Sequence, residues 1–477
     1  MIFLLSSVAF SQDKIKVACI GNSVTYGFGH DNPAVTSYPS QLAKMLGDDF
    51  EVGNFGKSGA TLLRKGHRPY NEQEEFKKAL EFAPDIAIIH LGLNDTDPRN
   101  WKYYKREFIS DYVALIEAFE KVNPDVEIYI CRMTPIFHWH HRFKKGTRDW
   151  YWEIQATIEN IAENIAEVKL IDLQETLYHR PDLMPDALHP NPEGAKLIAQ
   201  RVYSAITGDF GGLSIPAIYS DNMVIQHDKP FVVKGTADAG DEVSINLVET
   251  SSPWRLNKQK IKTTTGDDGR WEVVFNAPKV DGKSYTLTID TNSDDRIQFK
   301  NIVVGEVVLC SGNYMSTDNG QQSKDIDHNF NDIRLYYMNS DISSSWVEVE
   351  DIRPYGETLY NIGVKISDSL QMPVGLIYNV VEGASIESFI DRKTLEWHPI
   401  LIDVLYEWRN ADNVKEHLDS NEPSYNYDKL IAPLSSFPIS SVIWFEDDTD
   451  SDLDSIKKSA LIESWKKVFG EFSFILD

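Results

Sequence analysis

Residues 16–27 read KVACIGNSVTYG, and this stretch decides how the first part of the chain can fold. The apolar run from Val17 to Ile20 leads directly into a turn of small residues, Gly21-Asn22-Ser23. Such a run is typical of a buried strand, and open α/β sheets place their sites at the carboxyl end of a first parallel strand. A serine there can present its hydroxyl to the crevice, although taken alone it is more commonly a helix cap.

Strand-like and helix-like segments alternate from residue 14 to about 207. Apolar, β-branched runs bounded by Gly, Pro or Asp predict strands at 16–21, 50–56, 85–92, 126–135 and 168–173. Apolar spacings of three and four predict helices at 38–47, 108–122, 150–168 and 192–206, the last one capped by Asn191 and begun by Pro192. This alternation predicts a three-layer α/β/α domain with a parallel sheet over residues 13–207.

Residues suited to acyl transfer follow several of these strands. Gly59 lies in the turn after the second strand, where glycine lets backbone N–H groups approach a ligand, and Asn94 follows the third strand. Asp186 and His189 follow the fifth, spaced so that the carboxylate can bond one ring nitrogen of a histidine base. Taken singly, these are a turn glycine, a turn-capping Asn and a loop salt bridge. In combination they predict an oxyanion hole and a base for Ser23.

The combination resembles the SGNH (GDSL-type) hydrolase family over about residues 14–207. The four blocks of that family map to Ser23, Gly59, Asn94 and His189, with Asp186 completing the triad. The resemblance implies a flavodoxin-like sheet, with Ser23 as nucleophile and an oxyanion hole made by the N–H groups of Ser23 and Gly59 and the Asn94 amide. It implies no metal and no cofactor. The first block usually reads Gly-Asp-Ser, so Asn22 puts the local support of this loop in question.

Two further clusters are open to more than one interpretation. His138, Trp139, His140 and His141 follow the fourth strand and suit a cleft wall or a plain surface loop better than a metal site, because their spacing fits no common ligand set. Arg64, His67 and Arg68 follow the second block. They could contact an anionic or sugar substrate, or simply be solvated charges.

Composition excludes some functions. With 47 basic and 73 acidic residues the formal charge is −26, which argues against nucleic acid and anionic membranes as partners. Cys19 and Cys131 lie in strand-like runs and are expected to be buried thiols, and no zinc-ligand spacing appears. Residues 1–12 begin MIFLLSSVAF and resemble the later part of a signal peptide without its basic region, so we expect a periplasmic or secreted protein. No other stretch approaches a membrane span.

The second half of the chain has a different pattern of predicted strands and helices. We expect a linker at 208–216, a β-sandwich at 217–300 with strands near 243–249, 270–278 and 283–291, and an α/β region at 301–477. Segments such as 218–245, 302–312 and 372–389 resemble the sialate O-acetylesterase family, which has a second SGNH-like domain. Its Gly-Gln-Ser-Asn-Met motif is here Gly312-Asn313-Tyr314-Met315, which lacks the serine; Ser311 and Ser316 stand outside that position.

The rest of that second site is also missing from the sequence. A Trp-Tyr-Gln-Gly-Glu motif is replaced by WFEDD at 444–448, and the last histidine is His417, so no terminal Asp-x-x-His remains. This half is therefore expected to be a degenerate, non-catalytic partner domain.

The residues of the N-terminal half predict an esterase, and the resemblance of both halves to sialate and glycan acetylesterases implies a carbohydrate O-acetylesterase. The first candidate substrate is an acetylated sialic acid, and xylan or another plant polysaccharide is the second. A non-catalytic carbohydrate-binding protein and a lipid-directed esterase are the alternatives. The sequence gives neither the acetylated position nor the oligomeric state.

Overall fold

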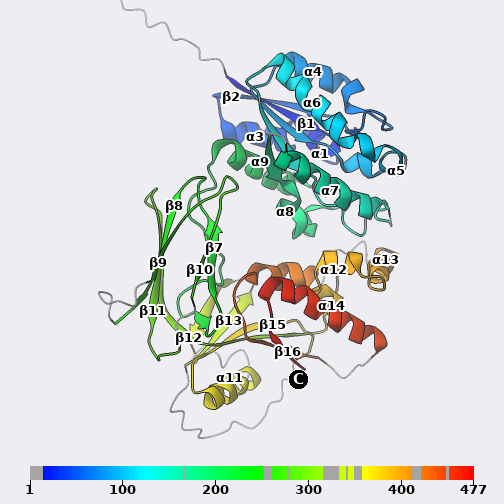
Figure 1. Ribbon diagram of the computed structural model, residues 1–477. Coiled ribbons are helices and arrows are strands. Elements are labelled where there is room, and N and C mark those ends of the chain that lie inside the picture. Colours follow the sequence, from blue (N-terminus) through cyan, green and yellow to red (C-terminus); the bar gives the residue numbers. More distant parts are fainter. Residues whose placement is uncertain are drawn as a thin grey trace, which may run out of the picture. The chain divides into compact units, whose positions relative to one another are not determined.

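The computed structural model describes residues 14–144, 146–164, 168–251, 259–276, 279–314, 332–339, 342–348, 357–410, 420–446 and 451–476. The chain divides into two compact units, Met1–Thr207 and Gly208–Asp477, and each is described by itself (Figure 1). The expected signal peptide at 1–12 lies outside the described residues. Among the residues described, no helix has both the length and the apolar character needed to cross a bilayer.

The N-terminal unit is built on a five-stranded sheet with the order β2-β1-β3-β4-β5, and every neighbouring pair is parallel. Its strands are β1 (Ile15–Gly21), β2 (Phe50–Gly56), β3 (Ile86–His90), β4 (Glu127–Arg132) and β5 (Val168–Asp172). Gly21 is in register with Gly56 on one side and with His90 on the other. The carboxyl ends of these strands therefore meet at one edge of the sheet.

Helices cover both faces of this sheet. They are α1 (Ser23–Tyr26), α2 (Pro33–Thr36), α3 (Tyr38–Leu46), η1 (Tyr70–Glu72), α4 (Glu74–Phe82), η2 (Leu93–Thr96), α5 (Trp101–Tyr104), η3 (Lys105–Glu107), α6 (Phe108–Val122), α7 (Thr147–Asn164), α8 (Leu173–Tyr178), η4 (Pro181–Leu183) and α9 (Pro192–Thr207). Helix α3 packs against α9, and α4 packs against α6. The predicted three-layer α/β/α fold is confirmed.

The core of this unit follows the apolar periodicity of the sequence. Leu42 of α3, Ile198 of α9 and Phe119 of α6 are fully buried with the strand residues Ile20 and Ile88. Cys19 and Cys131 are buried as free thiols, and burial raises the pKa of Cys19 to about 12. These cysteines therefore pack as small apolar side chains.

The second unit begins with β6 (Val224–Gln226), which pairs parallel with β12 (Arg296–Gly312), and continues with antiparallel strands. These are β7 (Phe231–Thr236), β8 (Glu242–Glu249), β9 (Gln259–Thr264), β10 (Arg270–Phe275) and β11 (Tyr285–Thr291). Strands β7 and β10 form one small sheet, while β9, β8 and β11 continue into β12. The first part of β12 pairs antiparallel with β11, and its second part pairs parallel with β15 and β16. The boundary expected at residue 300 thus falls inside one continuous strand.

The α/β part of this unit surrounds the second half of β12. Its other strands are β13 (Ile333–Asn339), β14 (Ile342–Glu348), β15 (Val374–Val380), β16 (Ser441–Phe445) and β17 (Ser473–Leu476). Its helices are α11 (Glu357–Leu370), η6 (Ile386–Phe389), α12 (Arg392–Trp397), α13 (Ile402–Asn410), η8 (Tyr427–Ile431), η9 (Ala432–Leu434) and α14 (Asp452–Phe469). The parallel strands of this part run in the order β13-β15-β12-β16-β17. The first of them in the chain, β12, pairs with the third and fourth, β15 and β16. In the N-terminal unit, by contrast, the first strand, β1, pairs with the second and third, β2 and β3.

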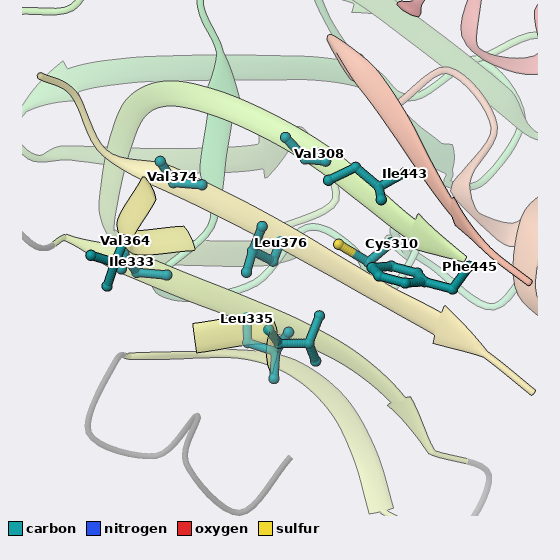
Figure 2. Packing of buried hydrophobic residues seen from close by; sticks show 10 residues of the cluster. Val308, Cys310, Ile333, Leu335, Val364, Val374, Leu376, Ile443 and Phe445 are labelled. Atoms are coloured by element: carbon teal, nitrogen blue, oxygen red, sulfur yellow. The ribbon is translucent and has the colours of Figure 1, made fainter. Parts of the chain in front are cut away.

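One apolar cluster holds these strands together. Figure 2 shows Val308 and Cys310 of β12 beside Leu376 of β15 and Ile443 of β16. Leu335 and Ile333 extend the cluster along β13, and most of these side chains are fully buried. The second half of β12 is therefore a central strand of a buried parallel sheet.

Candidate active site

Ser23 is the first residue of α1, directly after β1. Asn22 caps this short helix, because its Oδ1 accepts a hydrogen bond from the Val24 N–H at 3.0 Å. Gly27 closes the helix in a left-handed conformation (φ 86°), and the Phe28 N–H then bonds the Ser23 carbonyl at 2.9 Å. This tight turn holds the Ser23 backbone at the carboxyl edge of the sheet.

The structure brings Ser23, His189 and Asp186 into one chain of hydrogen bonds. His189 Nε2 lies 2.8 Å from Ser23 Oγ, and His189 Nδ1 lies 2.7 Å from Asp186 Oδ2. Asp186 Oδ1 also accepts the backbone N–H groups of His189 at 2.7 Å and Leu188 at 3.0 Å. Burial opposes ionisation of Asp186, but its bonds to His189 and Leu188 outweigh burial and lower its pKa to about 2. The carboxylate is thus charged throughout the neutral range and orients the imidazole.

Three further residues hold the His189 segment. The Phe28 ring lies against the imidazole, with 4.7 Å between centroids. His30 Nε2 donates to the Pro190 carbonyl at 2.9 Å, since a carbonyl can only accept. The Phe137 N–H bonds the carbonyl of Ala187 at 2.9 Å. The loops after β1 and β4 therefore both fix the position of the base.

Gly59 and Asn94 lie on the loops after β2 and β3, the two strands that pair with β1. The Lys57 N–H bonds the Gly21 carbonyl at 2.9 Å, which joins the β2 loop to the serine turn. Asn94 Nδ2 donates one hydrogen to the Ala60 carbonyl at 3.0 Å and retains a second hydrogen. Within the residues described, the N–H groups of Ser23 and Gly59 donate to no acceptor. These are the three donors that the sequence predicts for an oxyanion hole, and that role stays a prediction.

Asp95 joins the loops that carry two of these donors. Its carboxylate is fully buried and accepts the N–H groups of Leu62 at 2.9 Å and Leu63 at 2.8 Å. Burial raises the pKa of Asp95 to about 7, against the opposing effect of these two amides. Because Asp95 directly follows Asn94, it sets the spacing between the β2 loop and the β3 loop.

The histidine-rich segment after β4 reaches this site. His138 and His140 are buried, and His141 is exposed. Burial and the neighbouring charges of His141 and Arg142 lower the pKa of His140 to about 4, and the charges of Asp186 and His189 also act on His140. Over the described ranges, no group of three or more His, Cys, Asp or Glu is arranged to hold a metal ion.

The basic residues after the second block have separate environments. The His67 ring contacts the Asn100 side chain, and the Arg64 N–H bonds Asp111 at 2.9 Å. Arg68 is exposed, and its Nη1 donates to the Ser58 carbonyl at 2.8 Å. Of the three, Arg68 lies next to a predicted site residue, Gly59.

In the second unit, Ser311 does not stand where a nucleophile would. It is fully buried in β12 and donates to the Asn379 carbonyl at 3.2 Å. Asn313 and Tyr314 follow the end of β12, while Met315, Ser316, His417 and residues 447–448 lie outside the described residues. The described part of the degenerate motif therefore presents no serine hydroxyl.

Sequence reasoning did not assign a role to Phe28, His30 or Asp95. Asp95 directly follows the predicted site residue Asn94, but its partners are 32 and 33 residues away. His30 likewise meets Pro190 across 160 residues. No local pattern marks such distant partners.

Comparison with known proteins agrees with this geometry. Residues 19–197 match the model of the GDSL-like lipase/acylhydrolase family. The match to this family therefore extends over most of the N-terminal unit.

Individual relatives are similar over parts of the chain. An acetylxylan esterase of Xylanibacter ruminicola is 36% identical over 227 residues, covering 43% of this chain and 45% of that protein. The sialate O-acetylesterase of Homo sapiens is 20% identical over 289 residues, covering 54% of each chain. A solved carbohydrate acetylesterase from Xanthomonas citri aligns over 55% of this chain and 60% of its own, with 19% identity and a TM-score of 0.44. The chain thus spans about half the length of these two curated relatives.

Proposed function

We propose that the protein is a serine esterase that removes O-acetyl groups from carbohydrate. The observation that carries this proposal is the unbroken chain from Ser23 Oγ through the His189 ring to Asp186, with contacts of 2.8 and 2.7 Å. A serine hydroxyl is a weak nucleophile, and a hydrogen-bonded imidazole held by a carboxylate is the arrangement that activates it.

The proposed reaction is acyl transfer in two stages. Ser23 Oγ attacks the acetyl carbonyl while His189 Nε2 takes its proton. The negative oxygen of the tetrahedral intermediate is stabilised by the N–H groups of Ser23 and Gly59 and by the free hydrogen of the Asn94 amide. His189 then returns the proton to the departing sugar hydroxyl. Water, deprotonated by the same imidazole, releases acetate and restores Ser23.

The carbohydrate substrate is proposed from the relatives. The acetylxylan esterase has the higher identity, so an acetylated plant polysaccharide becomes the first candidate, ahead of the sialic acid esters expected from sequence. The sialate esterase remains the second candidate. Its 289-residue match is longer than the 207 residues of the N-terminal unit, so it includes part of the second unit.

The test is acetate release from 4-nitrophenyl acetate by the full chain and by Ser23→Ala. We expect the substitution to remove essentially all turnover, by about 10⁴-fold or more. Ser110→Ala, which alters an exposed serine on α6, is the matched control and should retain activity. Equal background rates for wild type and Ser23→Ala would contradict the proposal and favour a non-catalytic carbohydrate-binding protein.

The same assay tests whether the second unit is catalytic and which acyl group the enzyme prefers. Residual turnover in Ser23→Ala above the uncatalysed rate would reveal a second active serine, which we do not expect because Ser311 is buried. Rates that rise with acyl chain length, rather than being highest on acetate, would favour a lipid-directed esterase. A panel of acetylated xylan, pectin and sialosides would then rank the sugars.

A further inference from the structure

Two arginine side chains flank the candidate oxyanion hole. The Arg68 guanidinium lies against Gly59, with Nη1 3.1 Å from the position that a Cβ at this glycine would take. Arg142 Nη1 donates to the Oδ1 of Asn94 at 3.4 Å. Since Gly59 and Asn94 each supply a predicted oxyanion donor, each guanidinium group lies next to one residue of the predicted oxyanion hole.

Both arginines bond only neutral oxygens of the protein. Arg68 donates to the Ser58 carbonyl and Arg142 donates to the Asn94 amide. Within the part of the chain that the structure describes, neither guanidinium pairs with a carboxylate. By contrast, Arg132 and Arg180 of the same unit bond Asp172 and Asp182 at 2.6 and 2.7 Å. Two arginines without acidic partners are notable in a chain with 73 acidic residues and 47 basic ones.

We propose that Arg68 and Arg142 form a carboxylate-binding subsite, and that the substrates are acetylated acidic sugars whose carboxylate lies close to the acetyl ester. This inference rests on the proposed esterase function. A guanidinium carries five N–H donors in a planar fork that matches a carboxylate, and only one donor of each arginine has a bond within the described residues. A uronic acid or a sialic acid would supply such a carboxylate.

The net charge of the chain does not prevent this binding. At physiological ionic strength, charges separated by more than about 8 Å are largely screened, so the formal charge of −26 acts weakly on a substrate in contact with the two arginines. The lowered pKa of His140, about 4, leaves that neighbouring ring neutral at pH 7. The positive charge beside Gly59 and Asn94 therefore comes from Arg68 and Arg142.

The experiment compares matched pairs of esters with the full chain. One pair is an O-acetylated oligosaccharide bearing a uronic acid and its carboxyl methyl ester; the other is O-acetylated sialic acid and its methyl ester. We expect kcat/KM to be about tenfold higher on the free acid than on the methyl ester, mainly through KM. The pair with the larger ratio identifies the sugar.

Arg68→Gln and Arg142→Gln should each reduce this acid-to-ester ratio severalfold, and the double variant should bring it close to one. Lys121→Gln is the charge-matched control, because Lys121 is exposed near the end of α6, just before β4, and so lies away from the carboxyl edge of the sheet. The acid-to-ester ratio is the readout, and not the absolute rate. Arg142 contacts Asn94, so its substitution can also change the absolute rate on both esters.

A wild-type ratio of one on both pairs, or a high ratio that persists in the double variant, would overturn the subsite. In either case turnover of 4-nitrophenyl acetate that depends on Ser23 would leave the proposed esterase function intact. Loss of the ratio on Lys121→Gln would also contradict a local subsite, since only the overall charge would then matter.

Discussion

The Asn22 side chain ties the serine turn to the neighbouring strand, because its Nδ2 donates to the His90 carbonyl at 3.3 Å. Its Oδ1 caps α1 at the same time, and the residue is fully buried. An amide can both donate and accept, whereas an ionised carboxylate can only accept. The departure from the usual Gly-Asp-Ser therefore leaves the loop supported on both sides.

Replacing Asn22 by Ala should remove both bonds and leave the His90 carbonyl without this donor. We expect the free energy of unfolding to fall by about 2 kcal/mol. Chemical denaturation of the full chain measures this, and Asn22→Asp is the comparison because it keeps the helix cap. A loss for Asn22→Asp as large as that for Asn22→Ala would show that the cap contributes nothing.

Replacing Asp186 by Asn should lower kcat by roughly 10³–10⁴-fold, because the amide can no longer hold the imidazole in the tautomer that accepts the serine proton. The fold should persist, which circular dichroism would check. In the wild type, the acid limb of the rate profile should not follow Asp186, since its pKa of about 2 keeps it ionised well below neutral pH. A rate loss under tenfold for Asp186→Asn would argue against its assigned role.

Asp95 should make stability depend on pH. Its pKa in the folded protein is about 7, against an ordinary value of 3.8, so the folded state binds a proton more tightly than the unfolded state. The contribution of this proton is present below about pH 4 and is lost as the pH rises through 7. Unfolding measured from pH 4 to pH 8 should show this decrease in the wild type.

The control is Asp95→Asn, in which this component of the slope should be absent. The variant should also be less stable by about 1–3 kcal/mol, because one of the two amides of Leu62 and Leu63 would face an NH₂ group in a buried site. Identical slopes in the two proteins would assign the pH dependence to other groups.

Arg392 and Asp428 form a buried ion pair in the second unit, with 2.8 Å between Nη2 and Oδ2 and 1% exposure on each side chain. Asp428→Asn should destabilise the protein by about 3–5 kcal/mol, because the buried guanidinium would lose the charge of Asp428. Replacing both residues by apolar ones of similar size should cost less. Thermal unfolding of the full chain measures both, and a double variant less stable than Asp428→Asn would contradict this account.

The sequence predicted the first unit well because its three central strands, β1, β3 and β4, are almost entirely buried apolar runs. The predicted range of 50–56 coincides with β2, and 108–122 coincides with α6. Short apolar runs between helical periodicities allow few other folds. Ser23 was identifiable because it closely follows β1, and Asp186 and His189 because of their three-residue spacing before α9. The structure brings the three residues together.

Local sequence patterns did not predict the features in which distant parts of the chain come together. The residue pattern changes near residue 300, and this change suggested a boundary between two domains. Nothing in the pattern indicates that one continuous strand, Arg296–Gly312, crosses this boundary. Similarly, the partners of Asp95 and His30 depend on loops far apart in sequence. Their hydrogen bonds form only after the sheet has assembled.

The shared strand β12 has a consequence for how the second unit can be divided. Its first residues complete an antiparallel edge beside β11, and its last residues fill the centre of a parallel sheet between β15 and β16. A gene divided at codon 300 would keep nearly all of the β11 pairing in the first piece but would separate β6 from its partner, residues 303–305 of β12. Both pieces would expose open edges prone to aggregate, so recombination could exchange this unit only as a whole.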